Sequence, residues 1–178
     1  MIPIVVNQLH DTEPRWFAVN TRSKSEKLVQ RMLQKKDVHA YVPIQKLMRR
    51  YTRSVRMIEK PLINCYVFVK ILKPQYVPVL ETENVVGFVR FAKNLIAIPE
   101  HEIDILRRIT LEDELEIEAV QGNYTTGDAV EISAGNLIGL KGHVVKIEGK
   151  KKMQVELKQL GFSLIISIDT AFLSKIRE

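Results

Sequence analysis

The chain is poor in the residues from which metal and nucleophilic sites are built. It has one cysteine, Cys65, and its four histidines have no ligand-like spacing: His10, His39, His101 and His143. A single cysteine cannot close an internal disulfide, and without further thiols or paired imidazoles a zinc site is not expected. Because Cys65 stands inside an apolar segment, a buried small thiol is a simpler interpretation than a reactive one.

Long apolar runs and catalytic motifs are missing as well. No apolar run reaches the roughly 18–20 residues that cross a bilayer, and residues 1–13 lack the basic start and apolar core of a secretory signal. Gly139-Leu140-Lys141-Gly142 lacks the Ser or Thr ending of a phosphate loop, and no Gly-x-Ser-x-Gly elbow occurs. The acidic residues of 112–118, Glu114 among them, fit a solvated linker better than the metal site of a nuclease. We expect no enzyme activity, cofactor, metal or membrane contact, and a cytoplasmic monomer.

Charge is plentiful but unevenly distributed. Thirteen basic and three acidic residues lie between Arg15 and Lys60, whereas residues 111–120 contain five acidic residues and no basic one. A field polarised in this way favours a polyanion beside the first half of the chain. A solvated charged face would give the same pattern, so composition leaves both interpretations open.

The first half of the sequence predicts an α+β sandwich. Residues 16–19 predict a strand, and Ser23-Lys24-Ser25-Glu26 has the spacing of a capping box before an amphipathic helix. A basic hairpin over 45–60 precedes two further strands, 65–71 and 85–91, and Pro99 begins a second helix. This order of elements is typical of a sheet covered by helices.

The second half predicts a small β-barrel behind a linker. Residues 111–124 are acidic and aperiodic, and short strands with turn residues between them follow: 129–132, 143–147, 153–157 and 163–168. Their alternation favours strands over a helical hairpin. The predicted organisation is a flexible arm, an α+β domain, an acidic linker and a β domain, with the limits 1–14, 15–110, 111–124 and 125–178.

With these elements placed, the chain resembles the NusG family of transcription elongation factors from about Arg15 to Ile176. The matching features are the opening strand Trp16-Phe17-Ala18-Val19, the early acidic residue Glu26, the segment Tyr41-Val42-Pro43, and residues 61–69, which match the signature Pro-Leu-Phe-Pro-Gly-Tyr-Val-Phe-Val. Gly127-Asp128 and the glycines that follow are similar to a KOW domain. The chain departs from the signature at Asn64 and Cys65, where the family often has Pro and Gly, and we expect this to alter the loop before the strand.

The resemblance implies an N-terminal α/β sandwich, called the NGN domain, followed by a small SH3-like barrel, the KOW domain. Residues 86–91 and 98–103 are more similar to specialised paralogues, the UpxY-type antiterminators of Bacteroides and their RfaH relatives. Those proteins regulate long operons, notably for capsular polysaccharide. The polar motif by which RfaH-like members touch the other large polymerase subunit is not visible in residues 73–79.

The resemblance also implies the partners and the contact residues. The NGN domain of the family docks on the clamp helices, a coiled coil of the largest RNA polymerase subunit, and by position the anchors are Ile63, Tyr66 and Phe68. An aromatic anchor in a desolvated interface often costs about 2 kcal/mol or more when truncated. Strand alternation places Tyr66 and Phe68 on one face, so the same residues could also be sheet core.

Basic side chains carry the expected nucleic-acid contact. Arg22 and Lys24 match positions that face non-template DNA, and Arg31 extends that face along the helix; contacts of this kind neutralise phosphates. A second strip lies on the hairpin, where phosphate binding and simple solubility both remain open: Arg49, Arg50, Arg53 and Arg56.

The KOW glycines Gly135, Gly139 and Gly142 are expected to be structural, at turns or close approaches. The resemblance implies that this domain recruits Rho or a small-subunit ribosomal protein. The predicted function is therefore transcription elongation and antitermination. A ribosomal or RNA-binding KOW protein is the alternative.

Overall fold

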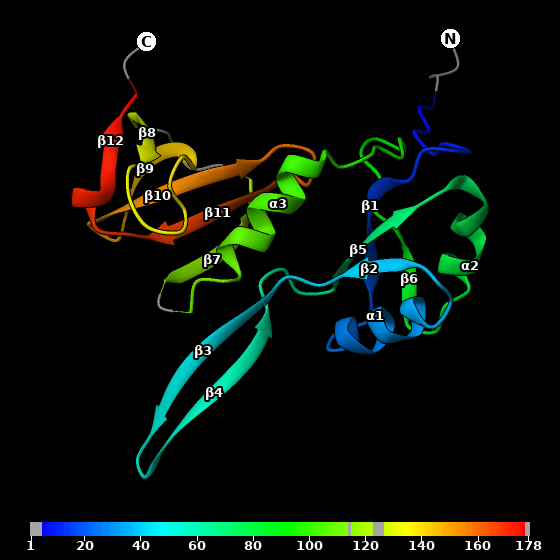
Figure 1. Cartoon of the computed structure of the whole chain (residues 1–178), viewed down its shortest axis with the longest axis horizontal. Helices are drawn as coiled ribbons and strands as arrows, with labels where there is room; N and C mark the ends of the chain where they lie inside the picture. Colours follow the sequence, from blue (N-terminus) through cyan, green and yellow to red (C-terminus); the bar gives the residue numbers. More distant parts are fainter. Residues whose placement is uncertain (1–4, 114, 123–126, 177–178) are drawn as a thin grey trace. The chain divides into compact units, whose positions relative to one another are not determined.

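A computed structural model describes residues 5–113, 115–122 and 127–176. The chain divides into two compact units, one formed by residues 5–43 and 63–103 and one by residues 44–62 and 104–176. Figure 1 shows the elements of both. The mixed α+β class predicted from the sequence is confirmed, with a helix-covered sheet in the first unit and a β-rich second unit.

The first unit is a four-stranded antiparallel sheet with the order β2-β5-β1-β6. Its strands are β1 (Arg15–Thr21), β2 (His39–Tyr41), β5 (Tyr66–Ile71) and β6 (Val85–Phe88). The helix α1 (Glu26–Gln34) packs against β2 and β5, and α2 (Tyr76–Leu80), which follows the 3₁₀ turn Lys73–Gln75, packs against β6. The central strands β1 and β5 are buried over most of their length because both faces of the sheet are covered.

Two features of the first unit differ from the sequence predictions. The predicted capping box of Ser23 and Glu26 is wrong, because α1 begins at Glu26 with Ser25 as its N-cap, and no side chain makes a capping hydrogen bond there. The described part of the predicted flexible arm pairs with a later segment: Gln8 N–H donates to Leu95 O at 3.0 Å, and Ala97 N–H donates to Gln8 Oε1 at 2.7 Å. Residues 1–4 of that predicted arm lie outside the described residues.

The second unit contains a two-stranded hairpin and a six-stranded antiparallel sheet. The hairpin is β3 (Ile44–Tyr51) with β4 (Ser54–Pro61), as predicted for 45–60. The sheet has the order β12-β8-β9-β10-β11-β7. Its strands are β7 (Glu116–Gln121), β8 (Ala129–Ile132), β9 (Lys141–Ile147), β10 (Lys150–Leu157), β11 (Phe162–Ser167) and β12 (Leu173–Lys175), with the 3₁₀ turn η2 (Thr170–Phe172) before β12.

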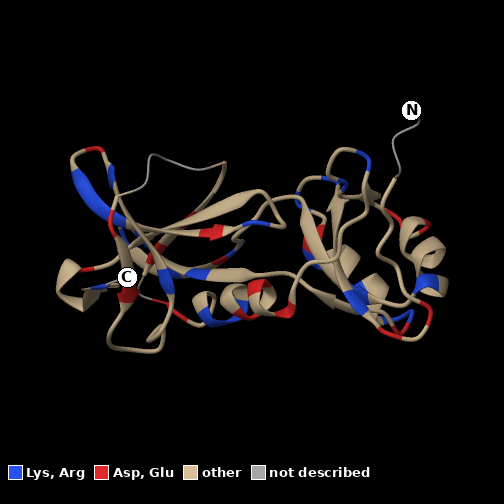
Figure 2. Ribbon diagram, turned by 90° about the horizontal axis from the view of Figure 1, so that it is seen from above, with Lys and Arg blue, Asp and Glu red and all other residues tan. Residues whose placement is uncertain are grey.

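The helix α3 (Glu100–Ile109) spans the boundary between the two units. Its first turn is acidic and its last turn is basic, the arrangement that a helix dipole favours; Figure 2 colours these residues red and blue. Its apolar residues Ile103, Leu106 and Ile109 are buried, as the sequence predicted. Among the described residues, no helix has both the length and the apolar character needed to cross a membrane.

The compact units do not follow the predicted domain limits. The predicted linker contains β7, which pairs with β11 from Glu116 opposite Ser167 to Gln121 opposite Phe162. Hairpin residues 44–62 group with the second unit, where Gln45 Nε2 donates to Leu115 O at 3.2 Å. Residues 114, 123–126 and 177–178 lie outside the described residues. Of the predicted KOW domain, 125–178, the structure therefore describes residues 127–176.

Two of the predicted structural glycines show why glycine is needed there. Gly139 has a φ of +81°, in the left-handed region that side chains disfavour. A Cβ added to Gly142 would lie 2.3 Å from the carbonyl oxygen of Gln154 on the neighbouring strand. Gly135 also has a positive φ, +82°. These glycines therefore shape the turns and the β9–β10 pairing of the second unit.

Candidate docking and anion-binding surfaces

The loop before β5 is fixed by two hydrogen bonds from the first part of the chain. The N–H of Cys65 donates to Oε1 of Glu26 at 2.7 Å, and the carbonyl of Cys65 accepts from the N–H of Thr21 at 2.9 Å. Glu26 is 4% exposed, so its carboxylate binds the Cys65 amide inside the fold and does not cap its own helix. Both bonds hold the residue directly before Tyr66, which begins β5.

Cys65 has a φ of +63°, in the left-handed region. An L-residue other than glycine pays roughly 1–2 kcal/mol for this conformation. At this position the family signature has glycine. The loop keeps the backbone conformation that glycine favours, although the residue here is cysteine. Of the nearby predictions, the buried thiol is confirmed only in part, because Cys65 is half-buried.

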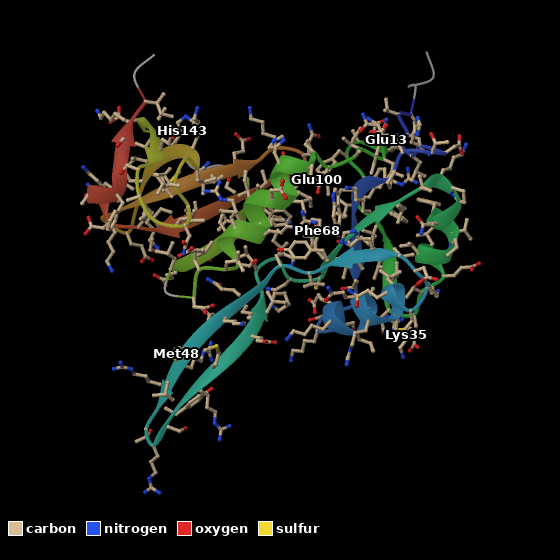
Figure 3. All side chains as sticks on the ribbon, in the orientation of Figure 1. Glu13, Lys35, Met48, Phe68, Glu100 and His143 are labelled. Atoms are coloured by element: carbon tan, nitrogen blue, oxygen red, sulfur yellow. The ribbon has the colours of Figure 1, made fainter. Side chains whose placement is uncertain are left out.

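Three aromatic residues share one face of the first sheet. The register pairs Tyr41 of β2 with Phe68 of β5, and Tyr66 lies two residues before Phe68 on the same strand face. The rings of Tyr41 and Phe68 are 6.3 Å apart. Tyr41 and Tyr66 are half-buried and flank Phe68, whose ring is labelled in Figure 3. We call Tyr41, Tyr66 and Phe68 the aromatic face.

Burial separates the three predicted anchors. Phe68 is 0% exposed and Ile63 is 2% exposed, so in this structure both are core residues rather than surface contacts. A side chain without accessible surface cannot enter an interface unless its covering moves away. Tyr66 retains exposed surface, and burial of the rest of its ring raises the pKa of its phenol, with the nearby Cys65 thiolate adding to the effect.

Tyr41 is the residue that sequence reasoning missed at this face. The segment Tyr41-Val42-Pro43 was recognised as extended, but its strand partner could not be known without the sheet. The pairing of β2 with β5 is what brings Tyr41 beside Phe68. The available signal was an aromatic residue two positions before Pro43, in a segment already recognised as extended.

The other end of the same sheet face is closed by polar contacts to the start of α3. Glu100 Oε2 accepts a hydrogen bond from Trp16 Nε1 at 2.8 Å and from Lys70 Nζ at 2.9 Å. Lys70 also lies 5.8 Å from the centroid of the Trp16 ring, within range of a cation–π contact. Because Trp16 is 2% exposed, this end is structural and the partly open end is the one that carries Tyr41 and Tyr66.

The predicted DNA-contact residues are all exposed. Arg22 and Lys24 lie on the turn between β1 and α1, and Arg31 lies in the last turn of α1. With a rise of about 1.5 Å per residue, the turn and Arg31 are separated by roughly 10 Å along the helix axis. Arg31 is favoured at the helix end by the dipole in any case, so its position there has a structural reason as well.

The described acidic residues Glu116 and Glu118 lie on the exposed face of β7. Ile117 between them is buried, so the acids point to solvent on an ordinary edge strand. Among the described residues, no group of three or more His, Cys, Asp or Glu side chains is arranged to hold a metal. Glu114 lies outside the described residues.

Comparisons with known proteins identify the first part of the chain. Residues 14–107 match the family model NusG, described as transcription termination factor nusG. The structure is similar to that titled "Domain interaction in Thermotoga maritima NusG", with a TM-score of 0.58 and 22% identity over 93% of this chain and 98% of that chain.

Conformation B of the MjSpt4:Spt5 complex aligns with a TM-score of 0.34 and 20% identity over 92% of this chain and 97% of that one. No curated protein sequence matches the chain significantly.

Proposed function

The chain belongs to the NusG family, whose model covers more than half of it, and from this premise we propose that it is an elongation and antitermination factor that binds RNA polymerase. The first unit docks on the clamp helices of the largest subunit. By holding the clamp closed it suppresses pausing and termination. The protein contributes binding energy and no bond chemistry, and it acts as a monomer in the cytoplasm.

The observation that carries the proposal is the aromatic face. Tyr41 and Tyr66 keep exposed surface next to a buried Phe68, and the loop before Tyr66 is fixed by Glu26 and Thr21. A rigid aromatic pair loses little conformational entropy on binding and presents both apolar surface and hydroxyls. These are the properties expected of anchors in a helix-binding surface.

The exposed cations Arg22, Lys24 and Arg31 lie along non-template DNA in this proposal. Their contacts go to phosphates, so their contribution falls as the salt concentration rises. This places a salt-dependent contact beside an aromatic contact that salt affects little.

We infer that the chain acts on particular long operons, such as those for capsular polysaccharide, because of its similarity to UpxY-type and RfaH-like paralogues. The β unit recruits the second partner, for which Rho and a small-subunit ribosomal protein are the candidates. Crosslinking of the isolated factor to each candidate, one at a time, distinguishes them.

The experiment that tests the proposal is in vitro transcription on a long template with strong pauses. The wild-type protein is expected to shorten pauses, and Tyr66→Ala is expected to lose most of this effect. Phe172→Ala is the matched control, because Phe172 is also an exposed aromatic residue, at 48%, but lies in η2 of the second unit. Equal loss in both variants, or no effect of the wild-type protein, would contradict the proposal.

A pull-down of polymerase distinguishes the proposed function from the alternative, a ribosomal or RNA-binding protein. Under the proposal, capture of polymerase survives nuclease and is lost with Tyr66→Ala. Capture that survives the substitution and disappears with nuclease would support the RNA-binding alternative.

A further inference from the structure

The hairpin of β3 and β4 is a long two-stranded ribbon whose outer part has no cover. All residues from Met48 to Met57 are exposed, with Met48 at 69% and Met57 at 56%. These two methionines are directly opposite each other in the register, and Figure 3 labels Met48 on the ribbon. Two strands of eight residues span roughly 26 Å, so the exposed part is a projecting element rather than a turn.

The charges on the outer part of this ribbon, from Met48 to Met57, are all positive. Four arginines and no acidic residue lie between Met48 and Met57. They occupy both faces and the turn, since Arg49 pairs with Arg56, Arg50 pairs with Val55 on the opposite face, and Arg53 lies in the turn. None of the four makes an ion pair with another residue in the part of the chain that the structure describes.

The pairing of Arg49 with Arg56 is unfavourable for the hairpin itself. Like charges directly opposite each other on neighbouring strands destabilise a sheet. Near the base of the same hairpin Lys46 is opposite Glu59, which is the favourable arrangement. A local arrangement that costs stability, with no ion-paired acid among the described residues, is what a site that binds an anion would show.

Shape determines which polyanion fits. The major groove of B-form DNA admits a two-stranded β-ribbon, with side chains on both faces reaching the groove walls. The major groove of A-form RNA is too narrow and deep for side chains to read. Exposed Met48, Val55 and Met57 add apolar atoms that can contact thymine methyl groups.

We infer that the β3–β4 hairpin is a duplex-DNA-binding ribbon, in which Arg49 and Arg56 bind phosphates on the walls of the major groove. This site goes beyond the proposed polymerase contact. It is separate from Arg22, Lys24 and Arg31, and it requires no polymerase for binding to duplex DNA.

The test is a fluorescence anisotropy titration of the full chain with a labelled DNA duplex of about 30 base pairs, roughly three helical turns, at several salt concentrations. Arg49→Gln combined with Arg56→Gln is expected to weaken binding about tenfold and to reduce the slope of log K against log salt by about 2. The melting temperature should stay equal or rise, because a repulsive pair is removed. A merely structural role for the arginines would lower it.

The matched control is Lys146→Gln combined with Lys151→Gln. These lysines are also exposed and directly opposite each other, on β9 and β10, so the control removes the same charge from the same kind of pair. They differ in having an acid nearby: Asp128 has a pKa below its ordinary value, through its hydrogen bond with Lys175 and, more weakly, the charge of Lys151. The control is expected to bind duplex DNA within about twofold of the wild-type protein.

Three results would overturn the inference. The hairpin and control variants could weaken binding equally, which would make the effect one of net charge. Single-stranded DNA or duplex RNA of the same sequence could show the larger dependence on Arg49 and Arg56. The hairpin variant could bind duplex DNA normally yet lose binding to nucleic-acid-free polymerase, which would make the ribbon a protein contact. These results are independent of the proposed polymerase contact, which is tested by the Tyr66→Ala variant.

Discussion

The carboxylate of Glu26 and the backbone amide of Cys65 are 39 residues apart in the chain and are joined by a hydrogen bond of 2.7 Å. The bond runs from the first turn of α1 to the loop that leads into β5. A charged acceptor in a buried position makes a stronger bond than a neutral one, and it is costly to remove. This contact therefore links the fold of the first unit to the position of Tyr66.

Replacing Glu26 should both destabilise the protein and loosen the aromatic face. Glu26→Ala leaves the Cys65 amide without its partner and is expected to cost about 1–3 kcal/mol in the free energy of unfolding. Glu26→Gln keeps an acceptor oxygen and should cost less. Urea unfolding measures both, with Glu118→Ala on the exposed face of β7 as the control expected to change stability by no more than about 0.5 kcal/mol. A Glu26→Ala protein as stable as this control would contradict the role given to the bond.

Substitutions of Cys65 should follow the backbone conformation rather than side-chain size. Because its φ is +63°, Cys65→Gly is expected to stabilise the protein by up to about 1 kcal/mol, after the greater flexibility of glycine in the unfolded chain is subtracted. Cys65→Val should destabilise it, since a β-branched residue tolerates positive φ poorly. Cys65→Ala separates the loss of the thiol from the backbone effect. Thermal unfolding in which Gly and Val had the same effect would show that strain at this position is unimportant.

Two glycines of the second unit should respond very differently to alanine. In Gly142→Ala the new methyl group meets the carbonyl of Gln154 at 2.3 Å, so β9 and β10 must separate, at a cost of about 3 kcal/mol or more. Gly149→Ala meets no atom within 4 Å and pays only for its φ of +78°, about 1–2 kcal/mol. Denaturant unfolding followed by circular dichroism compares them. A Gly149 variant that is the less stable of the two would contradict this ranking.

The pKa of Tyr66 makes stability depend on alkaline pH. Burial raises this pKa in the folded protein above the value of about 10 in the unfolded chain, so the folded state keeps the phenol proton to higher pH. Stability is therefore unaffected by this group below pH 10 and falls as the pH rises above it. Unfolding measured between pH 9 and about 11.5 should show a steeper loss in the wild-type protein than in Tyr66→Phe. Equal slopes would mean that the phenol is not shielded in the folded state.

Parts of the fold were predictable from the sequence because they depend on local patterns. An apolar, aromatic run predicted β5, and short apolar or alternating segments predicted most strands of the second unit. The burial of Ile103, Leu106 and Ile109 followed from helical spacing in α3. By contrast, α2 was missed because it contains Pro78, which argues against a helix in the sequence. Proline is tolerated in the first turn of a helix, and α2 is only five residues long. The strand β7 was mistaken for a linker because its acids occupy the solvent face and hide the alternation around Ile117.

The residues of the aromatic face were only partly predictable, because the sequence does not show which side chains the fold leaves exposed. Tyr66, Ile63 and Phe68 were predicted together as anchors because all three lie in the family signature. Which of them is buried depends on the elements that cover the sheet, and these are distant in the sequence. The capping box was predicted from spacing alone, whereas Glu26 has a stronger partner in the Cys65 amide, which is distant in sequence. Tyr41 required knowledge that β2 pairs with β5.

The central claim is that the partly exposed aromatic face binds polymerase, and the most direct test is the equilibrium dissociation constant for nucleic-acid-free polymerase. Tyr66→Ala is expected to weaken binding by about 2 kcal/mol, roughly 30-fold, while Phe172→Ala in the second unit leaves it unchanged. A Tyr66→Ala protein that is folded and binds polymerase as tightly as the wild-type protein would contradict the account.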